Sequence, residues 1–285
     1  MKFLKSFFKW FAIVLASIIV LMYIFDVDYL LRAVRTIYFK GYTTAFLEDY
    51  KDFPNREIKK GIAQPWAIAK DYNSVDATSI LETTHKELQT AAFLIIQNDS
   101  LFHESYFDGY TKGSKSNSFS MAKSVITMAL GKAIMEGKIK NLDQKVIDFL
   151  PELKGEFAKE VTVGDLSSMA SGLNWDEKYY SPLSIVTRAY FDDDLREVML
   201  GLEINEKPGQ SFKYLSGATQ LLAMCIEKAT GEYVADYVSK HFWQPMGAEN
   251  EALWQIDSEA NDMVKAYCCI ATNAKDFARF GKLYK

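Results

Sequence analysis

The sequence predicts a mixed α/β (α+β) fold in which helices flank an antiparallel sheet. Residues 91–96 form a continuous apolar run, and the turn Asn98-Asp99-Ser100 separates it from a second run over 101–107. This pattern indicates a β-hairpin, and the unbroken apolar run indicates a sheet covered on both faces. A helix predicted from Ser120 to about Glu136 is apolar all round, which indicates that it lies buried in the middle of the molecule.

Length and composition indicate a folded protein with a substantial core. With 285 residues, of which 49% are apolar and 25% charged, the chain can form one large domain or two. The net charge is −4, and no basic block follows the first ten residues. Nucleic acid is therefore not expected as a partner.

The N-terminus resembles a membrane-targeting segment. Three lysines among the first nine residues precede the apolar run 10–25, which carries no charge until Asp26. With Phe7 and Phe8 this run is just long enough to cross a bilayer, and the lysines predict a cytoplasmic N-terminus and an exported remainder. A cleaved signal peptide is the alternative, but residues 23–27 offer no small-x-small cleavage site. We therefore expect an uncleaved signal anchor over 1–25 and a membrane-anchored, extracytoplasmic (periplasmic) domain.

The other elements are expected in the following order. Residues 26–79 mix aromatic and charged residues around Pro54 and Pro65 and are interpreted as a juxtamembrane stalk. Gly137 fits the C-cap of the helix from Ser120. Further elements are a helix over 80–89, a short helix ending at Leu150, a loop-rich part over 174–210, helices over 218–229 and 233–242, a strand over 266–270, and a last helix from Thr272 or Asn273 to Tyr284.

The cysteines and histidines predict neither a metal site nor a cofactor. Cys225 lies in an apolar helical stretch, while Cys268 and Cys269 are adjacent and cannot easily bridge each other. No pair has metal-ligand spacing, and the three histidines are scattered. Buried thiols are expected, with a long-range bridge to Cys225 left open.

Ser120 and Lys123 carry the strongest chemical signal. A spacing of three residues places both side chains on one face of a helix, and the helix start supplies free N–H groups that support a developing anion. A desolvated lysine loses its proton more easily and can then take the serine proton. This is the S-x-x-K arrangement of acyl-serine hydrolases.

The motif alone is not specific. Ser6 and Lys9 also fit it, and about one accidental match is expected in a chain of this length. The alternative is that Ser120 caps the helix while Lys123 points into solvent. The neighbouring motifs decide between the two interpretations.

Short motifs from about Ala91 to the C-terminus resemble serine hydrolases of the class C β-lactamase and D-alanyl-D-alanine carboxypeptidase family. They are the hairpin 93–107, Phe119-Ser120-Met121-Ala122-Lys123-Ser124, the runs 161–166 and 169–173, Lys207-Pro208-Gly209 to Tyr214, 243–248 and 276–281. Tyr214-x-Ser216 and 266–269 most resemble the 6-aminohexanoate-dimer hydrolase and esterase-like branch. The resemblance implies a β-lactamase/transpeptidase-like domain over 80–285, with a mostly helical subdomain inserted at about 131–262 and the active site at their junction.

The resemblance also assigns catalytic roles. Ser120 matches the family nucleophile, and Lys123 matches the lysine that assists its deprotonation. Tyr214 matches the tyrosine of the Tyr-x-Asn motif, a candidate base for acylation and deacylation, because an adjacent ammonium lowers the pKa of a phenol. An ordinary aromatic residue before a core helix is the alternative for Tyr214.

Two departures from the family pattern bear on activity. Ser216 stands where the family usually carries an asparagine that binds the substrate amide, and its single donor argues against β-lactamase activity. The family's Lys-or-His-x-Gly strand, which supplies one oxyanion donor, would follow residue 285, so the resemblance implies a C-terminally truncated hydrolase with an incomplete sheet. Losing one such donor typically costs about 100- to 1000-fold in rate.

The expected function is acyl-serine hydrolysis of a small-molecule amide or ester, peptide-like amides included, without metal or organic cofactor. One alternative is a D,D-peptidase or penicillin-binding protein of cell-wall metabolism. The other is a binding module without turnover, against which the combination of Ser120, Lys123 and Tyr214 argues.

Overall fold

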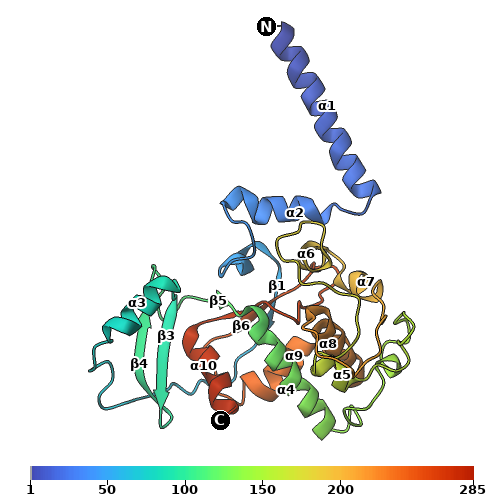
Figure 1. Cartoon of the computed structure of the whole chain (residues 1–285). Coiled ribbons are helices and arrows are strands. Elements are labelled where there is room, and N and C mark those ends of the chain that lie inside the picture. Colours follow the sequence, from blue (N-terminus) through green and yellow to red (C-terminus); the bar gives the residue numbers. More distant parts are fainter. Residues whose placement is uncertain (1) are drawn as a thin grey trace.

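The computed structural model describes residues 2–285 (Figure 1). Helix α1 (Lys2–Ile24) projects away from the rest of the molecule, and α2 (Tyr29–Thr36) lies across the top of the domain at the end of α1. The segment Phe3–Ile24 is long and apolar enough to cross a membrane, and none of it is buried inside the protein.

The central sheet has four antiparallel strands in the order β1-β6-β7-β5. Its strands are β1 (Asn55–Ile58), β6 (Ala252–Gln255), β7 (Ile270–Thr272) and β5 (Ser116–Asn117). Arg56 lies opposite Trp254, and Trp254 lies opposite Ile270, so β6 occupies the middle of the sheet and its Trp254 side chain is fully buried. The strand expected over 266–270 is thus displaced to 270–272, because residue 269 adopts a left-handed backbone (φ +78°) that no strand contains.

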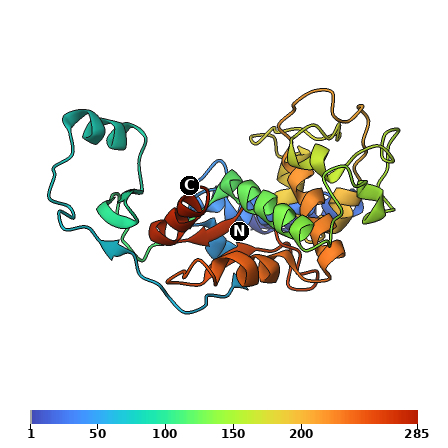
Figure 2. The same cartoon turned by 90° about the horizontal axis from the view of Figure 1, so that it is seen from below.

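The expected hairpin is present but belongs to a second, smaller sheet. Strands β3 (Ala92–Gln97) and β4 (Ser100–Tyr106) pair antiparallel, and β2 (Ala67–Ile68) adds to β4 in parallel. Helix α3 (Ser79–Glu87) contacts this sheet through His85 and Phe93, and α10 (Ala274–Leu283) packs against β3. The predicted cover is nevertheless incomplete, because Ile95 is 38% exposed. Figures 1 and 2 show the hairpin and α3 at one side, away from the helical part.

The interpretation of residues 26–79 as a stalk is wrong for most of this segment. Helix α2 already packs against α6 (Ile185–Phe191), and Tyr29, Ala33 and Ile37 are buried in the core. After the short 3₁₀ segments Tyr38–Lys40 and Asp49–Asp52, the chain forms β1, which pairs with β6 over its full length. Phe53, Ile58 and Trp66 are buried. Because this segment provides an edge strand and core side chains, the folded domain begins well before residue 80.

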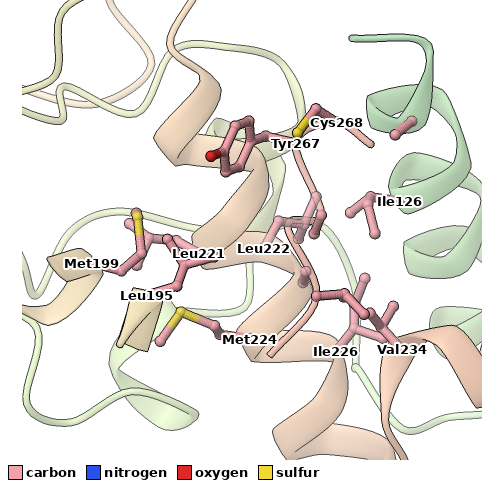
Figure 3. Packing of buried hydrophobic residues seen from close by; sticks show 14 of the residues in the cluster. Ile126, Leu195, Met199, Leu221, Leu222, Met224, Ile226, Val234, Tyr267 and Cys268 are labelled. Carbon is pink, nitrogen blue, oxygen red and sulfur yellow. The ribbon is translucent and has the colours of Figure 1, made fainter. Parts of the chain in front are cut away.

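Helix α8 (Ser216–Thr230) forms the centre of the helical part. All residues from 216 to 226 are buried, and α8 packs against α4 (Ala122–Met135) and α5 (Val163–Ser167). Figure 3 shows Leu221, Leu222 and Met224 of α8 among side chains from α7 (Leu195–Leu200) and α9 (Val234–Val238). The remaining helical segments are a 3₁₀ turn at Val146–Asp148, α6 (Ile185–Phe191), a π-helical turn at Ser239–Trp243 and α10 (Ala274–Leu283), which Asn273 caps.

Helix α4 buries one face rather than its whole surface, contrary to the sequence prediction. Lys123, Ile126 and Leu130 are buried, while Thr127 and Gly131 are exposed and Met135 is 82% exposed. The exposed positions recur every four residues and therefore form one stripe along the helix. Of the residues on this stripe, Ser124, Thr127, Gly131 and Met135, only Met135 is apolar, so the exposed face is the least apolar side of the helix.

A tight loop at Gly172 connects the capped helix α5 to the region around the site. The φ angle of Gly172 is +70°. The N–H groups of Asn205 and Glu206 both donate to the Gly172 carbonyl and hold the two chain segments close together. A Cβ atom on Gly172 would therefore collide with the Glu206 carbonyl oxygen. Gly231 has nearly the same φ, +74°, but open space around it.

We expect Gly172→Ala to lower the free energy of unfolding by about 3 kcal/mol, from left-handed strain plus steric overlap, and Gly231→Ala by only about 1 kcal/mol, from strain alone. Denaturant unfolding of the two variants measures the difference. Equal losses would mean that the Glu206 carbonyl does not constrain the loop.

Candidate active site

Ser120 lies at the exposed start of α4, in a 3₁₀ turn over Phe119–Met121. Strand β5 leads directly into this turn, and Ser118 fixes it to β7: its N–H donates to the Ile270 carbonyl (2.7 Å), and its Oγ accepts from the Ile270 N–H (3.1 Å). Phe119 adopts φ +44°, and its N–H donates to Asn117 Oδ1 (2.8 Å). The sheet therefore holds the residue before Ser120 in a strained conformation, which costs about 1–3 kcal/mol and is typical of functional sites.

Lys123 faces Ser120 one turn further along. Its Nζ donates to Ser120 Oγ (3.0 Å) and to the Tyr267 carbonyl (2.8 Å), and the residue is only 8% exposed. Burial lowers the pKa of Lys123 to about 8, although the charge of Glu177 acts in the opposite direction. The interpretation with Lys123 in solvent is excluded by this burial, and a buried amine of low pKa can serve as a base near neutral pH.

Tyr214 lies beside Ser120 and Lys123 and belongs to the segment that precedes α8. Its ring centroid lies 5.1 Å from Lys123 Nζ, and the residue is 41% exposed. Within residues 2–285, its hydroxyl makes no hydrogen bond to Ser120 or Lys123. The fold therefore brings Ser120, Lys123 and Tyr214 close together, with the lysine amine over the Tyr214 ring.

Ser216 lies in the wall of the same cavity, but its donor is already engaged. Its Oγ donates to Glu177 Oε2 (3.2 Å), and its N–H donates to Glu177 Oε1. A hydroxyl has a single proton to give, and in this structure Ser216 gives it to Glu177. A substrate-binding role for Ser216 stays a prediction.

Glu177 is the residue that sequence reasoning missed. Its carboxylate also accepts from Trp175 Nε1 (2.9 Å) and from the Tyr179 hydroxyl, so it ties a long loop to the start of α8. A single acidic residue in a loop-rich part carries no spacing signal. Only the contact with Ser216, 39 positions away, could have revealed it.

The neighbouring cysteines Cys268 and Cys269 form a disulfide, contrary to the prediction from their adjacency. The left-handed backbone at Cys269 accompanies this pairing. Cys225 is free and buried, and burial raises the pKa of its thiol. Within residues 2–285, no group of three His, Cys, Asp or Glu side chains is placed to hold a metal ion.

A cavity of about 500 Å³ opens beside the nucleophile. Ser120, Lys123 and Ser216 lie in its wall, and α2 and α6 provide much of the rest. Its volume lies in the range of small-molecule sites, which combine an apolar lining with a few polar groups.

The chain is similar to several known proteins. The chain is 27% identical over 214 residues to 6-aminohexanoate-dimer hydrolase of Paenarthrobacter ureafaciens, covering 71% of this chain and 54% of that protein. It is 24% identical to protein Flp of Staphylococcus aureus (strain MW2) over 178 residues, covering 59% of this chain and 35% of Flp. The chain thus spans about half or less of the length of these curated relatives.

Solved structures show the same fold. A 6-aminohexanoate-dimer hydrolase-like protein from Bacillus anthracis superposes with a TM-score of 0.66 at 21% identity, over 82% of this chain and 66% of that one. FmtA from Staphylococcus aureus gives a TM-score of 0.54 at 19% identity, over 78% and 69% of the two chains. Residues 77–281, more than two thirds of the chain, match the family model named Beta-lactamase. The chain therefore belongs to the Beta-lactamase family.

Proposed function

We propose that the chain is part of an acyl-serine hydrolase that cleaves an amide or ester through a covalent acyl-enzyme on Ser120. The observation that carries this proposal is the contact of 3.0 Å between Lys123 Nζ and Ser120 Oγ, with the lysine buried and its pKa lowered to about 8. Burying a lysine lowers the stability of the fold, and binding alone does not require a buried lysine of lowered pKa beside a serine. Hydrolysis is therefore favoured over binding without turnover.

In the proposed acylation step, Ser120 Oγ attacks the substrate carbonyl carbon while its proton passes to neutral Lys123. The N–H of Ser120 stabilises the oxyanion, since it lies at the start of α4 where backbone donors and the helix dipole favour negative charge. The bond to the leaving group then breaks, and the leaving amine or alcohol takes the proton from Lys123 with Tyr214 as the shuttle. Water attacks the acyl-serine, releases a carboxylic acid and returns the proton to Ser120.

We further propose that α1 anchors the domain to the cell membrane and that the domain lies on the extracytoplasmic (periplasmic) side. The unburied apolar surface of α1 and the lysines at its start support this orientation. A D,D-peptidase acting on cell-wall peptides is the second candidate for the reaction. The engagement of Ser216 by Glu177 disfavours it, because no free donor remains there for a peptide amide.

Trapping the acyl-enzyme tests the proposal. The protein is mixed with an activated acetyl ester, quenched in acid within the first turnover, and examined by intact mass and peptide mapping. We expect one acetyl group on the peptide that contains Ser120. Acetylation of a different residue, or full ester turnover with no acylated protein at any time, would contradict the mechanism.

A further inference from the structure

The cavity beside Ser120 extends from the catalytic residues to helix α2. Its far wall consists of residues from α2 and the turn that follows it, namely Leu30, Ala33, Val34, Ile37 and Tyr38. Val186, Phe191 and Pro182 add further apolar surface from the α6 region. A hydrocarbon chain attached to a carbonyl at Ser120 would therefore find apolar surface in the same cavity to pack against.

The polar side chains that line the cavity are all neutral, except that of Lys123. Of the described residues that line it, Lys123 alone has a side chain that carries charge in the neutral pH range. The other polar groups of the lining are hydroxyls of serine, threonine and tyrosine. A substrate fragment with charged groups would find no charged side chain other than Lys123 to pair with, and each unpaired group would cost about 1–3 kcal/mol. An aliphatic chain has no such groups.

Helix α2 also lies between the cavity and the proposed membrane anchor. Only residues 25–28 separate it from α1, and Figure 1 shows it crossing the end of α1 above the domain. Exposed aromatic residues and cations follow on this segment, namely Arg35, Tyr38, Phe39, Lys40 and Tyr42. Aromatic rings and basic side chains in this combination are typical of segments that lie at a membrane surface.

We propose that this cavity is an acyl-chain pocket and that the substrate is a long-chain acyl ester or amide of a membrane lipid, which reaches Ser120 from the bilayer side past α2. This inference rests on the proposed function. Ser120 Oγ forms the new bond to the acyl carbon, the C–O or C–N bond to the head group breaks, and the head group leaves with the serine proton. Water then releases a long-chain carboxylic acid and restores the serine hydroxyl.

The test uses the full chain in lipid nanodiscs and nitrophenyl esters from acetate to dodecanoate. We expect kcat/KM to rise by about fourfold per added methylene until the cavity is full. Val34→Trp fills the cavity from a position that is 37% exposed, so the fold can accept it. It should lower the ratio of kcat/KM for dodecanoate to kcat/KM for acetate by at least about tenfold.

Two further variants control the result. Thr44→Trp enters the cavity from another exposed wall position and should have the same effect, whereas Val75→Trp makes the same change as Val34→Trp at an exposed site outside the cavity and should have none. A flat or falling series, or equal behaviour of Val34→Trp and Val75→Trp, would overturn the pocket assignment while Ser120-dependent acetate hydrolysis still supports the hydrolase. Loss of Ser120 dependence with acetate would instead overturn the proposed function.

Discussion

Replacing Ser120 with alanine is expected to lower kcat/KM for an activated ester by about 10⁴- to 10⁶-fold, because the removed oxygen is the atom that forms the acyl bond. The substitution deletes one exposed hydroxyl at the start of α4, so the fold should remain. Lys123 Nζ loses its hydrogen bond to Ser120 Oγ but keeps the one to the Tyr267 carbonyl. Steady-state release of the coloured alcohol measures the loss.

Ser124→Ala is the matched control for this variant. Ser124 also lies near the start of α4 and is exposed, but it does not line the cavity. Its rate should stay within about threefold of the unmodified protein. If Ser120→Ala kept a tenth or more of the activity while Ser124→Ala lost it, a different nucleophile would have to be sought.

Replacing Lys123 with alanine is expected to cost about 10²- to 10⁴-fold in the acylation rate. The pKa of Lys123 is lowered to about 8, and the neutral amine is the base, so the rate should rise by about tenfold per pH unit below that value and level off above it. The variant should lose both the rate and this inflection, which a pH profile of kcat/KM displays.

Lys132→Ala provides the comparison for Lys123→Ala. Lys132 lies on the same helix but is partly exposed and pairs with Glu136 (Nζ to Oε1, 3.2 Å). Its removal should leave both the rate and the inflection near pH 8 in place. An unchanged inflection in Lys123→Ala would show that another group is the titrating base.

The same lowered pKa affects stability, and its sign can be stated. The folded state releases the Lys123 proton at about 8, whereas the unfolded chain holds it to about 10.4. Between these values the unfolded state binds more protons, so stability rises with pH across this window. Lys123 therefore destabilises the fold at neutral pH, which is the cost of keeping a base beside Ser120.

The spacing of residues along the sequence was sufficient to predict the contact between Ser120 and Lys123 at the centre of the candidate site. Ser120 and Lys123 meet because three residues span nearly one helical turn, and the caps at Gly137, Gly231 and Asn273 follow from local backbone chemistry. The approach of Tyr214 to Lys123 came from the family resemblance, since no local rule connects residues 91 positions apart.

The features that were missed depend on long-range packing. Strand β1 has the sequence Asn-Arg-Glu-Ile, which shows no strand pattern, and it forms because β6 offers a free edge. Glu177 gains its role only when the loop at 175–179 folds over the start of α8. The disulfide between Cys268 and Cys269 likewise occurs with a left-handed backbone conformation at Cys269, which the surrounding sequence does not predict.

The central claim is that Ser120 is a nucleophile activated by its surroundings. Intact-mass spectrometry after incubation with a fluorophosphonate probe tests it most directly, with Ser120→Ala measured in parallel and circular dichroism confirming that both samples are folded. We predict a single adduct on the unmodified chain and none on Ser120→Ala. A folded chain that forms no adduct, or an adduct that persists in Ser120→Ala, would contradict the claim.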